Sequence, residues 1–288
     1  MTGLTARLSG PRPTLDLRAH IVRGDFADVA LAGEVAAHNY VAPVAMRCTA
    51  ARTPVRKAGD AAATAVSELL FGEDFDLFDV AGDWGFGRTA ADHYTGWVAL
   101  AALAAPEAAP THRVSAALAP VFAAADIKAP VLMALPFGAR VAGTAGDRFV
   151  ALAGGGFVHH RHVAPPPGDA LAVARIFAGA PYLWGGRTPQ GVDCSGLVQA
   201  ALGAGGIAAP RDSDQQRAAL GAAVAFADRR AGDIVFFPGH VGLLLDADTL
   251  FHANAYWMTT LAEPLADVIA RLVADGVAEP VLGVRRVG

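Results

Sequence analysis

The stretch PYLWGGRTPQGVDCSGLVQAAL, residues 181–202, determines the fold of the last part of the chain, because it sets a cysteine between a glycine-rich approach and an apolar run. The apolar residues from Leu197 to Leu202 recur at helical spacing, and Asp193 stands where the N-cap of that helix would be. Cys194 is therefore predicted to begin a helix. The unpaired amides at a helix start favour a thiolate over a thiol, so we expect a nucleophile of low pKa there.

Composition limits the classes of protein to which the chain can belong. Its 288 residues suit two or three compact domains, and 53% hydrophobic with 17% charged residues indicate a globular protein. The formal net charge of -4, with both signs interspersed, argues against nucleic acid or an anionic membrane as a partner. The first residues, MTGLTARLSGPRPTLDLRAHIV, lack the apolar core of a signal peptide, so a cytoplasmic protein is predicted.

The middle of the chain, from about residue 44 to 163, consists of short apolar runs separated by Gly, Asp and Pro, which favours small antiparallel barrels. A weak repeat supports two of them: LFGEDFDLFDVAGDWGFGR (70–88) corresponds to PFGARVAGTAGDRFVAL (136–152). The closing strands, HYTGWVAL and GGFVHHRHV, resemble the last strands of bacterial SH3-like domains.

The stretch VAPPPGDA (163–170) is stiff and marks a boundary between domains. A helix is predicted over 169–180, followed after a second helix by three strand-like runs, GDIVFF, HVGLLL and TLFHAN. The expected division is an N-terminal extension packing on the barrels, two SH3-like barrels and an α+β C-terminal domain, with boundaries 1–43, 44–104, 105–164 and 165–288.

The last two strand-like runs bring a pair of histidines together. If residues 246–248 form the hairpin loop, Gly242 lies opposite His252, and His240 is a diagonal neighbour of His252 on the same face. Gly242 leaves room between the two rings, whereas a slip of one residue would separate them. A thiolate nucleophile needs a base and a group that orients the base, and this hairpin would supply both.

These motifs resemble, in order and spacing, the papain-like NlpC family of bacterial cell-wall peptidases over about residues 168–288. The resemblance implies that Cys194 is the nucleophile, His240 the general base and His252 the residue that orients it. The two barrels narrow the resemblance to one subgroup, the γ-D-glutamyl-L-diamino acid endopeptidases of murein recycling, which are cytoplasmic. Such enzymes act on murein peptides with a free N-terminal L-Ala and release L-Ala-D-Glu, the diamino acid being diaminopimelate or lysine.

The resemblance also implies a set of substrate-binding residues. Tyr182 would donate to the oxyanion. Glu73 and Tyr94 would close the amino-terminal end of the groove, with Glu68 or Asp92 as alternatives for Glu73. The full predicted set is Tyr182, Asp193, Ser195, Ser213, Glu73 and Tyr94.

No metal or other cofactor is expected. The run HHRH (159–162) is interpreted as a solvated strand end, and the glycines before Cys194 lack the Lys-Ser/Thr of a phosphate loop. Two other functions remain open at this point: an amidase or acyltransferase of the same papain-like kind, and a binding module for cell-wall peptides with an inert third domain. The sequence does not indicate an oligomeric state.

Overall fold

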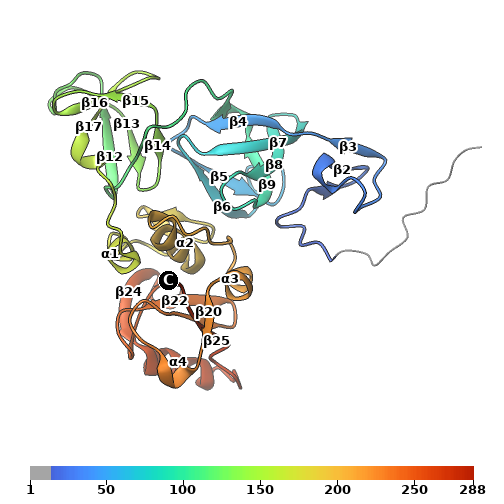
Figure 1. Cartoon of the computed structure of the whole chain (residues 1–288), viewed down its shortest axis with the longest axis vertical. Helices are drawn as coiled ribbons and strands as arrows, with labels where there is room; N and C mark the ends of the chain where they lie inside the picture. Colours follow the sequence, from blue (N-terminus) through green and yellow to red (C-terminus); the bar gives the residue numbers. More distant parts are fainter. Residues whose placement is uncertain (1–13) are drawn as a thin grey trace, which may run out of the picture.

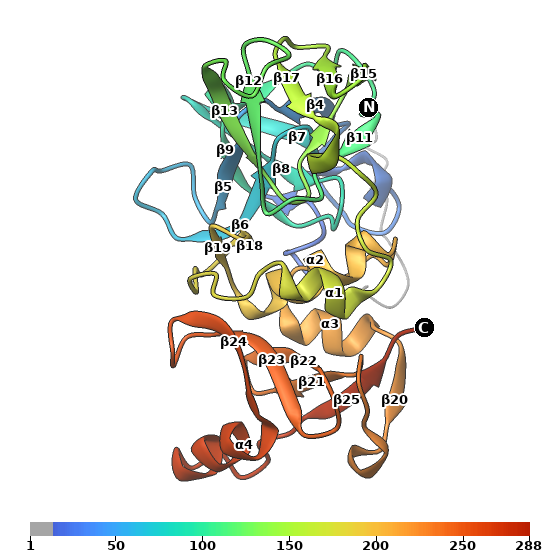
Figure 2. The ribbon, with the colours of Figure 1, turned by 90° about the vertical axis from the view of Figure 1, so that its left-hand side faces the viewer.

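The computed structural model describes residues 14–288. Two barrels lie side by side, and the C-terminal domain lies below them with its sheet farthest from the barrels (Figure 1). Seen from the side, the helices α1–α3 form a layer between the barrels and the sheet, and α4 covers the far face of the sheet (Figure 2). The α+β class predicted from the sequence is confirmed.

The N-terminal extension forms a small three-stranded sheet against the first barrel. Arg23 pairs with Asp79 of that barrel at 2.6 Å, and Arg88 of the barrel pairs with Asp28 at 2.7 Å. The elements are β1 (Val22–Arg23), β2 (Phe26–Asp28), η1 (Val29–Leu31) and β3 (Asn39–Val41).

The first barrel is a seven-stranded sheet with the order β10-β4-β7-β8-β9-β5-β6, and the second contains a five-stranded sheet with the order β13-β12-β17-β16-β15. The strands of the first are β4 (Val44–Cys48), β5 (Arg52–Arg56), β6 (Ala65–Leu70), β7 (Asp74–Ala81), β8 (Trp84–Thr89), β9 (Thr95–Ala99) and β10 (Leu103–Ala104). The strands of the second are β11 (His112–Arg113), β12 (Leu118–Phe122), β13 (Val131–Pro136), β14 (Arg140–Val141), β15 (Gly143–Ala145), β16 (Phe149–Leu152) and β17 (Phe157–His159).

The Phe-Gly turns of the repeat adopt the same backbone conformation. Gly72 and Gly138 both have positive φ, +75° and +90°, which glycine adopts without steric cost. A Cβ on Gly72 would lie 1.9 Å from the carbonyl oxygen of Arg140, so this turn of the first barrel packs directly on the second. The amide of Arg140 donates to the Phe71 carbonyl at 2.8 Å, which joins the two barrels.

The C-terminal domain is built on a six-stranded sheet with the order β20-β25-β21-β22-β23-β24. Along β21, Ile234 and Phe236 pack toward the helices while Val235 and Phe237 pack with α4, as alternation in a strand buried on both faces requires. Its helices are α1 (Ala170–Arg175), α2 (Cys194–Ala204), α3 (Ser213–Ala219) and α4 (Leu265–Ala274). Its strands are β18 (Arg187–Thr188), β19 (Gly191–Val192), β20 (Ala222–Val224), β21 (Ile234–Phe237), β22 (His240–Leu244), β23 (Thr249–Asn254), β24 (Thr259–Pro264) and β25 (Gly283–Arg286).

The helix predicted over 169–180 is shorter than expected. It ends at Arg175, although Asp169 caps it as predicted by accepting the Leu171 amide at 3.0 Å. Between residues 14 and 288, no helix has both the length and the apolar character needed to cross a membrane.

Candidate active site

Cys194 is the first residue of α2, and Asp193 caps that helix by accepting the Gly196 amide at 2.8 Å. The thiol is buried, with 7% of the residue exposed, and backbone hydrogen bonds from Val241 and Ser195 reach it. Because Val241 follows His240 on β22, the nucleophile lies beside the strand that carries the expected base. The predicted position of Cys194 at the start of a helix is therefore confirmed.

A buried arginine that the sequence analysis did not identify holds this helix cap in place. Arg211 is 1% exposed and binds both carboxylate oxygens of Asp193, at 2.5 and 3.0 Å. It also donates to Ser195 Oγ at 2.8 Å and to Ser67 Oγ of the first barrel at 3.1 Å. The second carboxylate oxygen of Asp193 accepts the Gly185 amide at 2.9 Å. Asp193 therefore ties the glycine-rich approach to the start of α2.

The two histidines meet through the predicted register. Leu244 pairs with Leu250, and the Leu245 amide donates to the Thr249 carbonyl at 2.9 Å, so Gly242 is opposite His252. His240 Nε2 lies 2.7 Å from His252 Nδ1. A Cβ on Gly242 would lie 3.0 Å from the His252 Cβ, so the glycine provides the space that the sequence analysis expected.

A carboxylate extends the histidine pair. Glu263 Oε1 lies 2.8 Å from His252 Nε2 and accepts from Arg271 at 2.6 Å and from Asn254 at 3.0 Å. Burial would raise the pKa of Glu263, but hydrogen bonds, with that from Arg271 first among them, outweigh burial and lower it. Glu263 was not predicted from the sequence, because no strand was expected where β24 lies.

The ionised Glu263 determines the tautomer of both rings. Since a carboxylate only accepts, His252 must carry its proton on Nε2, and its Nδ1 is then an acceptor. His240 therefore donates from Nε2 to His252, which leaves His240 Nδ1 with a free lone pair. The relay of Glu263, His252 and His240 thus prepares one nitrogen as a base.

The protonation of the nucleophile differs from the sequence-based expectation. Burial, reinforced by the charge of Asp193, raises the pKa of the Cys194 thiol to about 12. Burial and the neighbouring His252 lower the pKa of His240 to about 3. The prediction of a low-pKa thiolate is therefore wrong for the unliganded protein, in which both groups are neutral at pH 7. The proton must move from sulfur to His240 as attack occurs.

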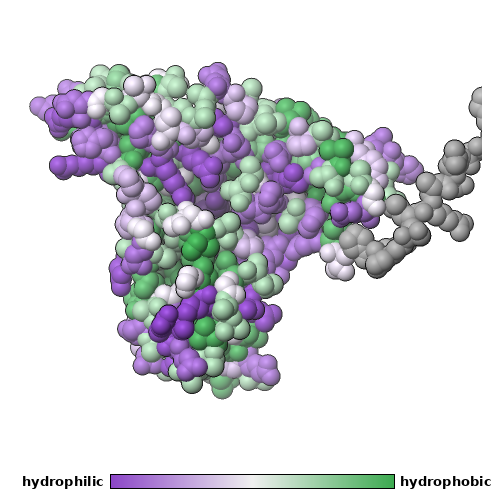
Figure 3. Space-filling view, in the orientation of Figure 1, coloured by the Kyte–Doolittle hydropathy of each residue, from purple (hydrophilic) through white to green (hydrophobic). Residues whose placement is uncertain are grey.

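A cavity of about 600 Å³ opens at Cys194 and runs between the C-terminal domain and the first barrel. Hydrophilic side chains gather on the underside of the barrels, where the barrels face the C-terminal domain (Figure 3). The lining residues are Asp16, Leu17, Arg18, Lys57, Val66, Phe86, Tyr94, Thr95, Gly96, Trp184, Asp193, Cys194, Ser195, Asp212, Ser213, Asp214 and Gly239.

Four of the predicted binding residues line this cavity with Cys194: Tyr94, Asp193, Ser195 and Ser213. Tyr94 donates its hydroxyl to Asp212 Oδ2 at 3.0 Å. Tyr182 is half-buried and packs on the same core as Cys194, and burial together with the charge of Asp193 raises the pKa of its hydroxyl, which keeps it protonated as a donor.

Glu73 is not where the sequence analysis placed it. Its carboxylate is buried, pairs with Arg187 at 2.8 Å, accepts the Leu70 amide at 3.0 Å and does not line the cavity. The two alternatives fail for the same reason: Glu68 is held by Arg52 and by the Arg187 amide, and Asp92 by Gln199 at 2.7 Å. Apart from Asp193, the carboxylates that line the cavity belong to Asp16, Asp212 and Asp214.

Those three carboxylates and Arg18, which together we call the acidic end, are joined by ion pairs of 2.8 Å from Arg18 to each aspartate. The hydrogen bond from Arg18 is the largest influence on the pKa of Asp16 and of Asp214, and it lowers both. Three carboxylates against one guanidinium leave net negative charge beside the cavity. No group of three or more His, Cys, Asp or Glu side chains in residues 14–288 is arranged to hold a metal ion.

Comparison with protein families supports this reading of the fold. Residues 179–268 match the NlpC/P60 family, and residues 55–103 match the bacterial dipeptidyl-peptidase SH3 domain. An NlpC/P60 family protein from Bacillus cereus has the same fold, with a TM-score of 0.71 and 20% identity, over 84% of this chain and 99% of that one.

Two curated relatives match about a third of the chain. A probable endopeptidase of Mycobacterium tuberculosis is 38% identical over 104 residues, which is 34% of this chain and 27% of the relative. The γ-D-glutamyl-L-lysine dipeptidyl-peptidase of Bacillus subtilis is 37% identical over 93 residues, 30% of this chain and 31% of the relative. The chain thus spans about a third or less of the length of these relatives.

Proposed function

We propose that this chain, which carries an NlpC/P60 domain joined to a bacterial dipeptidyl-peptidase SH3 domain, is a cysteine peptidase. Its substrates are murein peptides with a free N-terminal L-Ala, and it cleaves the bond between γ-D-Glu and the diamino acid. The observation that carries the proposal is one cavity that is lined by Cys194 and by the acidic end, with the strand of the histidine relay beside Cys194. The similarity to a γ-D-glutamyl-L-lysine dipeptidyl-peptidase supports the choice of bond.

The chemistry is acyl transfer through a thioester. Cys194 Sγ forms a bond to the γ-carbonyl carbon while its proton passes to His240 Nδ1, and the carbonyl oxygen becomes an oxyanion. Amides at the start of α2 and the Tyr182 hydroxyl are the donors for that oxyanion. The imidazolium then gives its proton to the leaving amine as the C–N bond breaks. Water, deprotonated by His240, hydrolyses the thioester and restores the thiol.

The charge of the acidic end selects the amino terminus of the substrate. A peptide whose L-Ala nitrogen is free brings an ammonium group, which the surplus of carboxylate charge favours. Acetylation removes that charge and adds bulk at the closed end of the cavity. Because the carboxylates are 28% to 62% exposed, loss of the charge alone costs about 1 kcal/mol, and the steric clash of the acetyl group adds to that cost. Cleavage of the acetylated peptide is therefore expected to be well over tenfold slower.

The test is product analysis by mass spectrometry with L-Ala-γ-D-Glu-diaminopimelate and its N-acetyl derivative. The proposal expects release of L-Ala-D-Glu from the first, well over tenfold slower cleavage of the second, and none by Cys194→Ala. A deamidated product or a transferred acyl group would indicate an amidase or acyltransferase instead. Tight binding of the peptide without turnover would indicate a binding module.

A cytoplasmic site of action belongs to the same proposal, because recycled murein peptides carry free amino termini, whereas in polymeric wall the L-Ala nitrogen is joined to muramic acid. Fractionation of cells that express the protein tests this location. Recovery in the wall or medium fraction would contradict it.

A further inference from the structure

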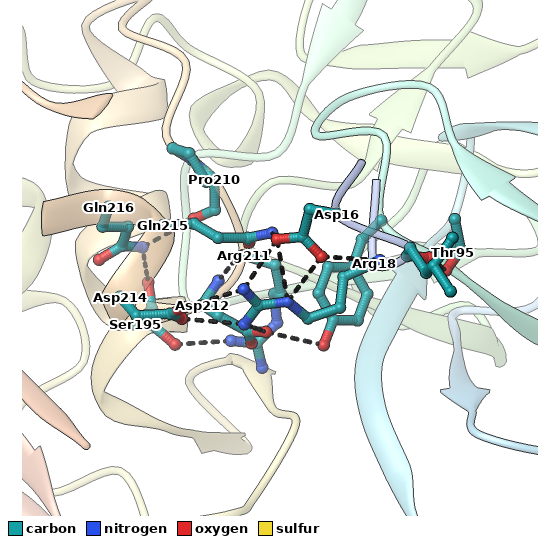
Figure 4. A network of polar contacts seen from close by, with 12 residues as sticks. Asp16, Arg18, Thr95, Ser195, Pro210, Arg211, Asp212, Asp214, Gln215 and Gln216 are labelled. Atoms are coloured by element: carbon teal, nitrogen blue, oxygen red, sulfur yellow. Dashed lines mark hydrogen bonds and ion pairs between the residues drawn. The ribbon is translucent and has the colours of Figure 1, made fainter. Parts of the chain in front are cut away.

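The acidic end of the cavity includes part of the N-terminal extension. Asp16, Leu17 and Arg18 line the cavity together with residues of the first barrel and of α3. Figure 4 shows this segment lying between Thr95 on the barrel side and Asp212, Asp214 and Gln215 on the helix side. Three parts of the chain that are distant in sequence therefore close one end of the cavity.

The segment is anchored on both sides. On the barrel, the Thr95 amide donates to the Arg18 carbonyl at 2.8 Å, and the Thr95 hydroxyl donates to the Leu17 carbonyl at 2.8 Å. On the helix, Gln215 Nε2 donates to Asp16 Oδ2 at 2.8 Å. A segment held by backbone and side-chain bonds to two domains is a fixed wall rather than a loose strand across the opening.

Every N–H of the Arg18 guanidinium is used within the acidic end. Nε donates to Asp16 at 3.0 Å, and Nη2 donates to Asp16 and Asp214, both at 2.8 Å. Nη1 donates to Asp212 at 2.8 Å and to Asp214 at 2.9 Å. A guanidinium has five N–H donors, so none remains to bind a substrate. Arg18 therefore acts on substrate only through the carboxylates that it holds.

Asp212 is the carboxylate that Arg18 and the first barrel hold together. Its Oδ2 accepts from Arg18 Nη1 and from the Tyr94 hydroxyl, at 2.8 and 3.0 Å. Its side chain also caps α3 in a reciprocal arrangement with Gln215. These contacts fix the carboxylate in the lining of the cavity, between the barrel and the helix.

We infer that Leu17 and Arg18 form the wall that sets the length of substrate on its amino side, and that Arg18 is the positioning residue that aims Asp212 at the substrate ammonium. This inference rests on the proposed function and deepens it. Selection for a free amino terminus then depends on the N-terminal extension as well as on the barrel.

The experiment compares kcat and KM for the free and N-acetylated forms of L-Ala-γ-D-Glu-diaminopimelate in the wild type and in Arg18→Ala. We expect KM for the free peptide to rise about tenfold, with kcat within about threefold, because Cys194 and its relay are untouched. The ratio of kcat/KM between the two peptides should fall toward one. The ratio for Arg18→Lys should lie between those of the wild type and Arg18→Ala, since an ammonium cannot reproduce the planar fork of a guanidinium.

Arg47→Ala is the matched control. Arg47 pairs with Asp74 at 2.7 Å in the first barrel and does not line this cavity, so its loss removes an arginine–carboxylate pair without touching the wall. It should keep the discrimination of the wild type. Leu17→Ala keeps every ion pair, because only the Leu17 carbonyl is used in bonding, and should raise relative cleavage of the acetylated peptide. If thermal melting shows that Arg18→Ala is unfolded, Leu17→Ala still tests whether this segment limits the length of the substrate.

The outcomes separate the inference from the proposed function. If the wild type cleaves neither peptide, the proposed function fails. If the wild type discriminates and both Arg18→Ala and Leu17→Ala discriminate equally well, only the inference is overturned. A fall in KM for the free peptide in Arg18→Ala would also overturn it, because Arg18 would then be a cation competing with substrate.

Discussion

His240 Nε2 lies 2.7 Å from His252 Nδ1, and this contact leaves Nδ1 as the only nitrogen of His240 that can accept a proton from the thiol. The assignment depends on Glu263, whose charge keeps the proton of His252 on Nε2. Glu263→Gln removes that charge, and its amide accommodates either tautomer of His252. We expect kcat to fall about 100-fold or more, by comparison with the loss of the orienting carboxylate in other triads.

Glu279→Gln is the control for Glu263→Gln, because Glu279 is exposed. Steady-state kinetics should show wild-type kcat for that variant. Wild-type kcat in a folded Glu263→Gln protein would mean that the carboxylate does not set the tautomer.

The pH dependence of kcat/KM follows from the two pKa shifts at the catalytic pair. Because the pKa of His240 is lowered to about 3, the base stays neutral well below its usual range, and the thiol, with a pKa near 12, supplies no alkaline limb. For the free-amine peptide we expect a flat profile on the acid side, with at least about four fifths of the pH 7 value kept at pH 5.5. A decline above about pH 8 should follow the α-amine of the substrate.

A pH profile with an acid limb would contradict this prediction. Half-loss of kcat/KM near pH 6.5, with circular dichroism showing an intact fold, would mean that His240 titrates normally. Rapid alkylation of Cys194 by iodoacetamide at pH 6 would mean that its pKa is low, as its place at the start of α2 predicts.

Folding stability should also depend on the histidines. Burial lowers the pKa of both His240 and His252 in the folded chain, so the unfolded chain binds protons first as pH falls below 6.5. Stability is therefore full above pH 6.5 and is lost as pH falls, by up to about 1.4 kcal/mol per pH unit for each histidine. Urea denaturation at pH 7 and pH 5 measures the loss, and His240→Gln should reduce it. An unchanged loss in that variant would contradict the shift at His240.

The sequence was sufficient where local rules act. The helix start at Cys194 follows from Asp193 and the apolar spacing after it, and the register of His240 with His252 follows from the turn at residues 246–248. Both depend on contacts between residues close in sequence. Periodicity and turn chemistry carry such information.

The acidic end could not be predicted, because it brings together residues from two distant parts of the chain. Arg18 and Asp212 are 194 positions apart, and nothing local to either predicts the pair. From the sequence, Glu73 was the expected partner for an ammonium group, with Glu68 or Asp92 as alternatives, and Asp212 was not identified. The structure separates them, since Arg187 neutralises Glu73 within the protein.

Gly242→Ala tests the space between the histidines. A Cβ there would lie 2.8 Å from Leu250 Cδ1 and 3.0 Å from the His252 Cβ, so β23 must shift away from β22. We expect a loss of about 1 to 3 kcal/mol in unfolding free energy from overpacking, and a fall in kcat as the His240–His252 contact lengthens. Gly232→Ala, at a turn position with open space around it but positive φ, separates backbone strain from crowding. Wild-type kcat in Gly242→Ala would mean that the contact tolerates the shift.

Glu73→Ala tests whether the substrate ammonium binds at the acidic end of the cavity or at Glu73, as the sequence suggested. Glu73 and Arg187 are both largely buried and pair at 2.8 Å, so removing the carboxylate leaves the Arg187 guanidinium partly uncompensated. We expect a loss of roughly 2 to 4 kcal/mol in unfolding free energy, measured by urea denaturation. The preference for the free peptide over the acetylated one should remain, because Glu73 does not line the cavity. Asp212→Asn should behave in the opposite way, with a modest change in stability and a reduced preference. If Glu73→Ala instead cleaves both peptides equally while Asp212→Asn keeps the wild-type preference, the substrate ammonium binds at Glu73 and the acidic end has another role.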